Sequence, residues 1–478
     1  MRTFRRFFAL PLSVLIPSCM VVGVDYTSPD TITPDYWNQN LSSDLNSGNS
    51  SLESWWTKFN DSTLNLLIDK ARESNRDLAI AYERVSEARA SRGVSRSALF
   101  PSVDFNGGVT RNRTSENLGI PGGKTSDFWT TGLDAGWEID FFGGVRRSIE
   151  SADATVEGAE ELYRDTMVSL FAEVAFNYIQ VRTIERRIQV AENNIKLQKN
   201  SVDLTRDRLD AGLVPETDTS QAETNLATTK AIIPLLRNER SIAVNRLATL
   251  IGRFPQPTES LLGKSKGIPT PKGSAGVGIP ADLVRARPDI RAAERQLAAQ
   301  TALIGVAEAD LLPRFALTGN FELQSLHANN LLESSSRNYG FGPSFRWNIF
   351  SAGRIKNEIA IEESRTKQAF YSYQNAVLKG VEEVENSLST VRNERDRLSQ
   401  LNTAVESSRK TESLVYSSYE EGLTDFQTVL DAQRTVFDNE DQRVISEGQI
   451  AAGYVSLYKS LGGGTKMKPP TVEKTGKP

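Results

Sequence analysis

The spacing of apolar and polar positions changes period twice within the first half of the chain. Apolar residues recur at helical spacing from about 62 to 98, and Pro101 ends this pattern because proline breaks a helix. Apolar and polar residues then alternate over 103–110 and 129–139, which is typical of strands with one apolar face. A helical pattern without a breaker follows from about 144 to 211. The pattern predicts a helix, two strands and one long helix, in that order.

The second half of the chain repeats this order. Alternation returns over 315–323 and 339–349, and an unbroken helical pattern runs from about 354 to 421. Shorter helical patterns cover 218–251, 281–311 and 425–461. Individual residues also match between the halves: Leu99, Phe100 and Pro101 match Leu311, Leu312 and Pro313 at an offset of 212, and Trp137, Gly212 and Gly252 match Trp347, Gly422 and Gly462 at an offset of 210. A nearly fixed offset predicts an internal duplication.

Both long helical patterns carry an apolar residue at every seventh position. The first series is Val174, Val181, Ile188, Ile195, Val202 and Leu209, and the second is Val384, Val391, Leu398 and Val405. A strict heptad imposes a left-handed supercoil, so the long helices are predicted to form coiled coils. At about 1.5 Å per residue each would reach roughly 100 Å, a length that no compact globule needs.

The four predicted strands have the length that a tilted strand needs to cross a bilayer, about ten residues. Four strands cannot close a barrel alone, because the smallest bacterial barrels have about eight. If the strands span a membrane, the barrel must therefore be shared between chains. An ordinary half-buried sheet is the alternative, but Trp and Tyr near the strand ends favour the membrane interpretation.

The N-terminus has the layout of an export signal. Arg2, Arg5 and Arg6 precede an apolar stretch from Phe7 to Ile16. The sole cysteine, Cys19, stands where a bacterial lipoprotein carries its acylated first residue, although Ile16, Pro17 and Ser18 depart from the common Leu-Ala-Gly pattern. We expect residues 1–18 to be a signal peptide and Cys19 to carry covalent lipid. An uncleaved signal anchor is the alternative, which Pro11 and Pro17 disfavour.

Composition excludes several classes of function. One His and one Cys leave almost no scope for a metal cluster, a Cys nucleophile or a Ser-His-Asp triad, so we expect no enzyme, no metal and no other cofactor. Lys and Arg number 56 against 60 Asp and Glu, which leaves no basic excess for nucleic acid. His327 is predicted to be an exposed loop residue between the last two strands.

At this point the chain resembles the TolC/OprM family of outer membrane factors, the ducts of tripartite efflux and secretion systems. The motifs that carry the resemblance are Cys19 with Gly23, Asp25, Tyr26 and Pro29; Trp55, Trp56 and Phe59 ahead of Leu64, Leu67 and Ile68; Arg287, Pro288, Asp289, Ile290 and Arg291; and Leu430, Asp431, Ala432, Gln433 and Arg434. Each motif is weak alone, but their order on a duplicated plan of strands and helices is specific.

The resemblance implies a mainly α fold with a membrane β-barrel. Three chains would each contribute four strands to a shared 12-strand barrel, and their long helices would form a coiled-coil α-helical barrel across the periplasm. The expected organisation is a signal peptide at 1–18, a lipidated extended segment at 19–61, repeat 1 at 62–252, a linker at 253–280, repeat 2 at 281–463 and a disordered tail at 464–478.

The resemblance also implies which residues gate the channel at its periplasmic end. Asp431 and Arg434 lie in the Leu-Asp-Ala-Gln-Arg motif, which contributes an acidic ring and gate contacts in the family. Asp218 matches a family aspartate that pairs with a tyrosine, and Tyr419 stands at the tyrosine position. A plain solvated ion pair is the alternative for Asp431 and Arg434, because residues three apart share a helical face.

The turns after the two long helices are the expected tips of the helical barrel. They comprise Gly212, Leu213 and Val214 in the first half and Gly422, Leu423 and Thr424 in the second, with each glycine where a helix C-terminal glycine belongs. In the family these tips dock the periplasmic adaptor. Thr424 stands where TolC has an arginine, and Gln427 replaces an apolar pore residue of OprM-like members, so a more polar constriction is expected.

The preferred hypothesis is therefore a passive exit duct, lipid-anchored and inserted in the outer membrane. Its implied partners are two further copies of the chain, a periplasmic adaptor, an inner membrane pump of the RND type and outer membrane lipid. Two alternatives stay open: a duct for type I protein secretion, and a structural coiled coil of the envelope that does not conduct.

Overall fold

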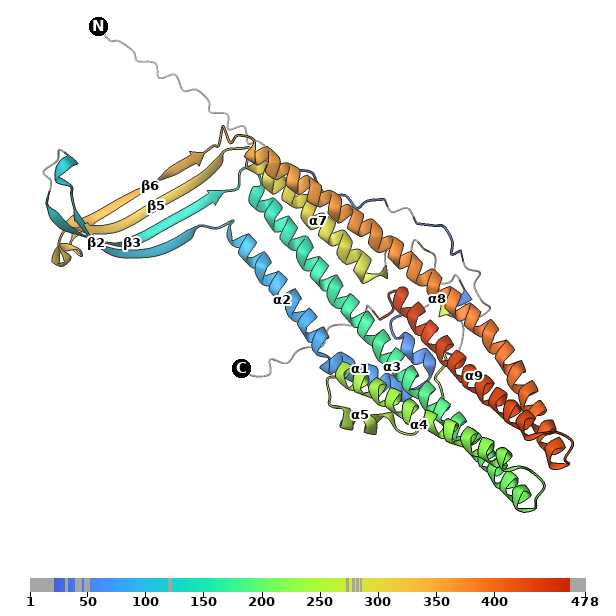
Figure 1. Ribbon diagram of the computed structural model, residues 1–478. Helices are drawn as coiled ribbons and strands as arrows, with labels where there is room; N and C mark the ends of the chain where they lie inside the picture. The colour runs from blue at the N-terminus through green and yellow to red at the C-terminus, as the bar shows by residue number, and fades with distance from the viewer. Residues whose placement is uncertain are drawn as a thin grey trace, which may run out of the picture. The chain divides into compact units, whose positions relative to one another are not determined.

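The computed structural model describes residues 21–30, 33–38, 45–46, 52–118, 123–271, 275–276, 280, 283 and 286–464 (Figure 1). The predicted signal peptide, Cys19 and residues 465–478 lie outside the described residues. The chain forms two compact units, each built from segments of both halves of the sequence. The strand unit comprises Met1–Pro29, Ser86–Gly158 and Glu294–Ser372; the helical unit comprises Asp30–Val85, Ala159–Ala293 and Tyr373–Pro478.

The strand unit contains one antiparallel sheet in the order β2-β3-β5-β6. Its strands are β2 (Ser102–Arg113), β3 (Thr125–Ile139), β5 (Arg314–Ser325) and β6 (Arg337–Arg346). All four predicted strands are confirmed, although β6 ends at Arg346, before the Trp347 and Ile349 that the alternation included. His327 is exposed between β5 and β6, as predicted.

The register gives this sheet one apolar and one polar face. Phe105 pairs with Leu133, Leu133 with Phe321, and Phe321 with Tyr339. All four side chains are exposed in the chain. The adjacent row, on the opposite face, consists of Asp104, Asp134 and Asn320. Large exposed apolar surfaces mark interaction sites, so the apolar face is suited to contact another apolar medium or molecule.

Corresponding tryptophans near the end of the second strand of each pair make the same hydrogen bond. The indole of Trp137 donates to the carbonyl of Leu99, and that of Trp347 donates to the carbonyl of Leu311, each at 3.0 Å. Each indole thus links its strand to the backbone of the turn between a helix and the strand that follows it.

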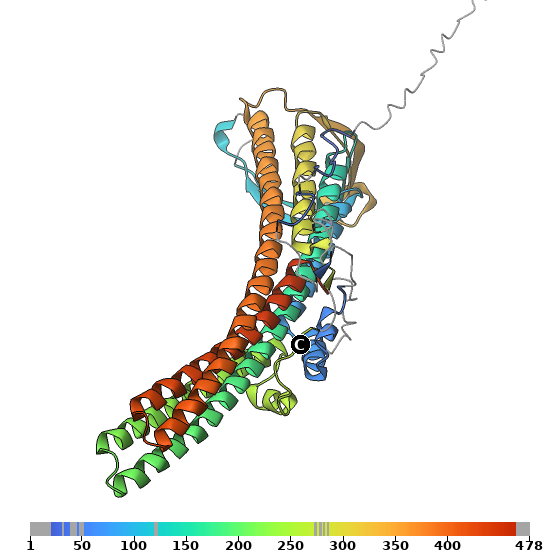
Figure 2. The ribbon, with the colours of Figure 1, turned by 90° about the vertical axis from the view of Figure 1, so that its right-hand side faces the viewer.

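The helices are α1 (Ser62–Ser74), α2 (Arg76–Ser97), α3 (Gly144–Asp210), α4 (Glu216–Leu250), α5 (Pro255–Leu262), α7 (Pro288–Ala309), α8 (Arg354–Glu420) and α9 (Phe426–Ser460). The two long helices end within one residue of the predicted bounds. In the helical unit α3 runs antiparallel to α4, and α8 runs antiparallel to α9, with a tight turn closing each pair (Figure 2). Within the part of the chain that the structure describes, none of the helices is long and apolar enough to cross a membrane.

An aromatic cluster forms the centre of the helical unit's core. Trp55 and Trp56 belong to the short helix η1 (Trp55–Phe59). Trp55 stacks on Tyr458 with ring centroids 5.3 Å apart, and Trp56 meets Phe171 edge-on at 4.9 Å. This motif of the family resemblance therefore fills the core.

The predicted heptad positions lie on the inner side of the long helices. Val174, Val181, Val202, Val384, Val391 and Val405 are buried, while Ile188, Ile195, Leu209 and Leu398 are half-buried. The heptad pattern thus marks the packed faces of α3 and α8.

Three local features were not visible in the sequence pattern. The helix expected over 62–98 is broken at Asn75, whose side chain accepts from the Leu78 N–H at 2.8 Å and donates to the Leu250 carbonyl at 2.9 Å. The supposed linker contains the helix α5. Gly464, the first residue of the expected tail, is buried, and its N–H donates to the Leu52 carbonyl at 2.9 Å. A Cβ on Gly463 would lie 2.7 Å from Trp55, and one on Gly464, whose φ is +97°, would lie 3.1 Å from Phe171, so glycine allows this close approach.

Candidate functional site

The two turns that close the helix pairs have the same backbone geometry, and we call residues 211–215 and 421–425 the tip turns. In the first, the Gly212 N–H donates to the Leu209 carbonyl and the Leu213 N–H to the Arg208 carbonyl, both at 2.8 Å. In the second, the Gly422 and Leu423 N–H groups donate to the carbonyls of Tyr419 (2.9 Å) and Ser418 (2.8 Å). These bonds define a Schellman motif at the end of each long helix.

Glycine is required at both turns by the backbone conformation. The φ angles are +71° at Gly212 and +78° at Gly422, which other L-residues adopt only with strain. Steric crowding does not explain the glycine at 212, since a Cβ there would meet nothing within 4 Å. The sequence prediction of a C-terminal helix glycine is therefore confirmed at both positions.

Each tip turn presents one exposed leucine. Leu213 is 68% exposed and Leu423 is 74% exposed, whereas Val214 and Thr424 are half-buried. Asp425 caps α9 by accepting from the Thr428 hydroxyl at 2.7 Å and from the Thr428 N–H at 2.8 Å, and these two hydrogen bonds lower the pKa of the Asp425 carboxyl. The tips thus offer apolar side chains on rigid, capped turns, which suits them to contact a partner.

A small apolar cluster packs the helices behind the tip turns. It consists of Val202, Ala222, Tyr419, Phe426, Val429 and Leu430. Tyr419 is its central member: the ring lies 5.2 Å from that of Phe426, and the Arg208 guanidinium lies 4.8 Å above it. Arg208 also donates to the Tyr419 carbonyl at 2.5 Å. The Tyr419 side chain therefore joins α8 to both α3 and α9.

The hydroxyl of Tyr419 reaches the predicted partner, Asp218. Their oxygens lie 3.5 Å apart, at the outer limit of a hydrogen bond. Burial, followed by the nearby Asp218 carboxylate, raises the pKa of the Tyr419 phenol, so the hydroxyl keeps its proton and donates. The structure thus brings this predicted pair together, through a weak contact between α4 and α8.

Asp431 and Arg434 lie on the exposed side of α9. Their charged atoms are 3.8 Å apart, and both side chains are more than half exposed. Arg434 instead donates from Nε to Asn225 on α4 at 3.1 Å, while Asp431 accepts from Gln427 at 3.0 Å. Asp431 therefore keeps an exposed carboxylate, and its ion pair with Arg434 is long.

A groove of about 510 Å³ lies between α4 and α9 beside these residues. It is lined by Glu216, Thr217, Ser220, Gln221, Thr224, Gln427, Leu430 and Arg434. Seven of the eight lining residues are polar or charged, and Gln427 is one of them.

The core of the helical unit becomes polar toward the tips. On α3, Asn194, Gln198, Ser201 and Thr205 follow one another at helical spacing and are at most 5% exposed. Gln433 of α9 donates to Ser201 at 2.8 Å. The side-chain oxygens of Gln198 and Gln433 have no hydrogen-bond partner among the described residues. Buried polar atoms without partners weaken packing, so this polar stripe stabilises the contact between α3 and α9 less than an apolar stripe would.

Sequence reasoning missed this polar stripe. The signal was present in the four polar residues spaced at intervals of four, three and four along α3. The neighbouring apolar heptad series obscured it.

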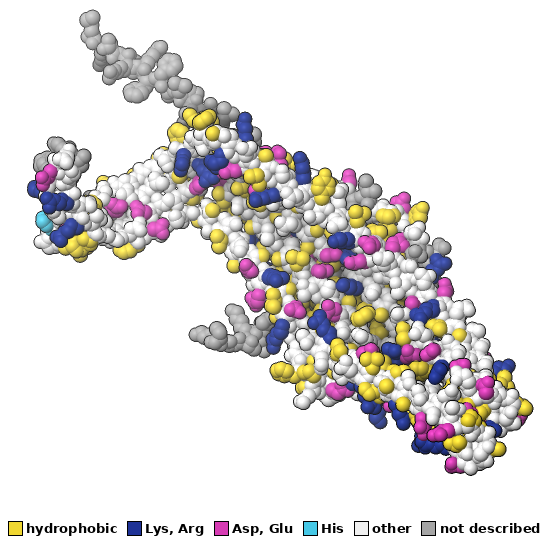
Figure 3. Space-filling model, in the orientation of Figure 1, with side chains coloured by type: hydrophobic (Ala, Val, Ile, Leu, Met, Phe, Trp, Pro, Cys, Tyr) yellow, Lys and Arg dark blue, Asp and Glu magenta, His cyan; other side chains and the backbone are white. Residues whose placement is uncertain are grey.

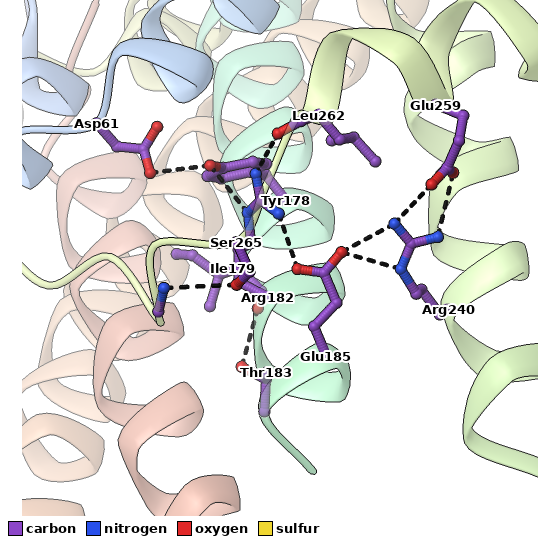
Figure 4. A network of polar contacts seen from close by, with 11 residues as sticks. Asp61, Tyr178, Ile179, Arg182, Thr183, Glu185, Arg240, Glu259, Leu262 and Ser265 are labelled. Carbon is purple, nitrogen blue, oxygen red and sulfur yellow. Dashed lines mark hydrogen bonds and ion pairs between the residues drawn. The ribbon is translucent and has the colours of Figure 1, made fainter. Parts of the chain in front are cut away.

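A second feature that the sequence did not reveal is a charge network around Arg182 (Figure 4). The Arg182 side chain is almost fully buried and donates to the Tyr178 hydroxyl at 3.1 Å, to Glu185 at 2.7 Å and to the Leu262 carbonyl. Glu185 also accepts from Arg240 of α4 at 2.8 Å. Burial raises the pKa of the Tyr178 phenol to about 12.

This network fixes several helices to one another. Arg240 binds Glu259 of α5 through two hydrogen bonds, at 2.7 and 3.1 Å, and Tyr178 donates to Asp61 at 2.8 Å. A buried guanidinium is stable only with such full pairing. The network therefore supports the scaffold that carries the tips.

The architecture is that of an outer membrane channel. The chain aligns with the outer-membrane channel OprN with a TM-score of 0.87 and 35% identity, over 93% of this chain and 99% of that one.

Basic and acidic side chains are mixed over the helices in the view of Figure 3, and neither sign of charge dominates that face.

The chain belongs to the outer membrane efflux protein family. The sequence model of that family matches residues 67–253 and again residues 279–463. Nodulation protein T of Rhizobium leguminosarum bv. viciae is 31% identical over 461 residues, 96% of this chain and 93% of that protein. The solvent efflux pump outer membrane protein SrpC of Pseudomonas putida is 31% identical over 410 residues, 85% and 86% of the two chains. Family and fold are those of channel proteins of the outer membrane rather than enzymes.

Proposed function

We propose that this chain is the exit duct of a tripartite efflux system, gated at its periplasmic end. Membership of the outer membrane efflux protein family is the observation that carries this function. The names of its relatives, such as a solvent efflux pump outer membrane protein, agree with it. Such a duct has no energy source of its own, so a periplasmic adaptor and an inner membrane pump, of the RND type, would open and feed it.

The working channel in this proposal is a trimer with a shared 12-strand barrel. Strands β2 and β6 are the two edges of the sheet and have unpaired backbone groups on their outer sides among the described residues. Pairing β6 of one chain with β2 of the next would remove every edge after three copies. The apolar face would then contact lipid, and the row of Asp104, Asp134 and Asn320 would face water.

The two halves of each chain are proposed to be copies of one ancestral unit. The family model matches both halves, and Trp137 and Trp347 make equivalent hydrogen bonds.

The gate is proposed to lie at the tips. Three copies would place three exposed Asp431 carboxylates near one axis, which would favour cations there. The two pairs that the sequence assigned to the gate are weak: the Tyr419–Asp218 bond is 3.5 Å long, and the Arg434–Asp431 pair, within α9, is 3.8 Å long. Exposed pairs contribute about 0–1 kcal/mol each, so contact with an adaptor could open the gate.

The exposed leucines of the tip turns, Leu213 and Leu423, are proposed to meet the adaptor, with Gly212, Val214, Gly422 and Thr424 holding their turns in shape. Covalent lipid on Cys19 completes the proposal as a membrane anchor, since two or more acyl chains bind a bilayer firmly.

Substitution of the tip leucines tests the duct and its docking together. Cells that lack the native gene would express the wild type or a Leu213→Asp/Leu423→Asp variant, and retention of a fluorescent pump substrate would be measured. We expect the variant to lose efflux while the purified protein still conducts in bilayers. Normal efflux by the variant would contradict docking at the tips, and an absence of efflux from the wild type would contradict the duct.

A further inference from the structure

Residues 21–29 lie in the strand unit as an extended segment against α3 and α7, and we call them the tether. The tether carries Gly23, Asp25, Tyr26 and Pro29, a motif to which the proposed transport function gives no role. Its contacts divide into two groups, one at each end.

Arg147 of α3 holds the first part of the tether. Its guanidinium donates to the Val22 carbonyl at 2.9 Å, to the Gly23 carbonyl at 3.2 Å and to the Asp25 carboxylate at 2.7 Å. The remaining contact is with Glu150 on the same helix, at 2.7 Å. The Arg147 side chain is only 4% exposed. Because a buried guanidinium is costly unless it is paired, its contacts with the tether indicate a dedicated binding site.

Three glycines let the tether approach the helices more closely than side chains would allow. A Cβ on Gly23, whose φ is +95°, would lie 2.5 Å from Cα of Gly305. A Cβ on Gly305 would lie 2.8 Å from the Val22 carbonyl oxygen, and one on Gly143 would lie 2.7 Å from the Val21 side chain. Real atoms do not approach this closely, so the fit depends on all three glycines.

Glu294 of α7 holds the second part of the tether. Its Oε1 accepts from the Tyr26 hydroxyl at 3.1 Å and from the Ser28 hydroxyl at 2.8 Å. The Tyr26 ring also packs against Ala154, Ala298 and Ala299. Two groups of contacts a few residues apart fix the direction of the segment as well as its position.

The first group of contacts lies beside the end of a strand. The Val22 N–H donates to the Phe142 carbonyl at 3.1 Å, and β3 ends at Ile139, three residues before Phe142. Cys19 precedes Val21 by two residues, so its Cα lies within about 7 Å of that of Val21. A flexible linker of ten residues would instead give Cys19 a range of about 17 Å.

We propose that the tether fixes the lipid attachment site beside the end of β3, with Arg147 and Glu294 as positioning residues. This inference rests on the proposed acylation of Cys19. The acyl chains then enter the bilayer next to the strand ends, and the anchor restrains the depth of the sheet. A flexible linker would hold the protein at the membrane without fixing the depth of the sheet.

Spin labelling of the tether tests this inference. Val24 is 61% exposed, so a nitroxide attached to a Val24→Cys variant would not disturb the contacts. Cys19 is the chain's only native cysteine, and acylation would block its thiol. The full-length protein would be reconstituted in phospholipid vesicles, with mass spectrometry to establish acylation. We expect the nitroxide to give a slow-motion spectrum. Its accessibility to oxygen and to a nickel chelate should place it at the depth of the lipid headgroups.

A loosened tether provides the comparison. Gly23→Val combined with Tyr26→Ala changes the tether alone and leaves α3 and α7 intact. We expect several-fold faster label motion and a broader depth distribution, with acylation retained. Arg354→Gln serves as the control, because among the described residues the Arg354 side chain pairs with Glu358 on its own helix and not with the tether.

The outcomes distinguish failure of the tether's positioning role from absence of the lipid on Cys19. A mobile label in the acylated wild type, or a loosened variant with unchanged motion and depth, would overturn the positioning role alone. An unacylated Cys19 in the mature protein would overturn the lipid anchor and the tether's role with it.

Discussion

The ring and the hydroxyl of Tyr419 contribute separately to holding the tips closed, and substitutions can measure each contribution. The ring is 3% exposed and contacts Phe426 within its own helix pair, but it also lies under Arg208 of the other pair. The hydroxyl makes a single contact of 3.5 Å with Asp218. If the tips open by separation of α8 and α9 from α3 and α4, only the contacts between the pairs are lost.

The two contributions differ in size. A hydrogen bond of this length to a partly exposed carboxylate contributes about 0–1 kcal/mol, so Tyr419→Phe should change the open probability less than about fivefold. The cation–π contact and the ring's packing between the pairs together contribute about 2 kcal/mol. Tyr419→Ala should therefore raise the open probability about thirtyfold, since 1.4 kcal/mol is a factor of ten.

Open probability in planar bilayers is the assay for these variants. Tyr371→Ala is the matched control, because Tyr371 lies on the same helix and is exposed. Equal opening by Tyr419→Phe and Tyr419→Ala would show that the hydroxyl holds the tips, which would refute the reasoning. No opening by either variant would place the gate elsewhere.

Three further predictions concern stability. Gly422→Ala should lower hydrogen-exchange protection at the Leu423 amide by about 1–2 kcal/mol, since alanine resists the φ of +78°; unchanged protection would contradict the argument. Asp61→Ala should lower the free energy of unfolding by about 1–3 kcal/mol in denaturant titrations, because Asp61 caps α1 through Thr63 at 2.8 Å and accepts from Tyr178; Asp61→Asn should retain most of the cap. Burial raises the pKa of the Asp165 carboxyl above its usual 3.8, so the folded state favours the protonated carboxyl. As pH rises through the folded-state pKa, the carboxyl becomes charged and the folded protein becomes less stable. Asp165→Asn should therefore raise the melting temperature at pH 7, with no gain below about pH 4, and an equal gain at both pH values would exclude titration of Asp165 as the cause.

The elements that depend on local pattern could be predicted from the sequence. The bounds of α3 and α8 follow from an unbroken helical period that ends at Gly212 and Gly422, and a positive φ explains both glycines. The strands follow from alternation, because each has one apolar face. In these cases the signal and its physical cause lie within the same few residues.

Elements that depend on distant partners could not be predicted. Asn75 breaks a helix by bonding to the Leu250 carbonyl, 175 positions away, and Gly464 packs on Phe171. The same holds at the tips. Sequence matching proposed the pair of Tyr419 and Asp218, but only the structure shows that their contact is weak and that the ring is the better-packed part.

Single-channel conductance of the purified protein in planar bilayers, under a salt gradient, tests the central claim most directly. The wild type should show small cation-selective openings, and Asp431→Ala should enlarge them or remove their selectivity, because it removes an exposed carboxylate at the gate. A well-folded oligomer that conducts no ions would contradict the account and favour a structural coiled coil of the envelope.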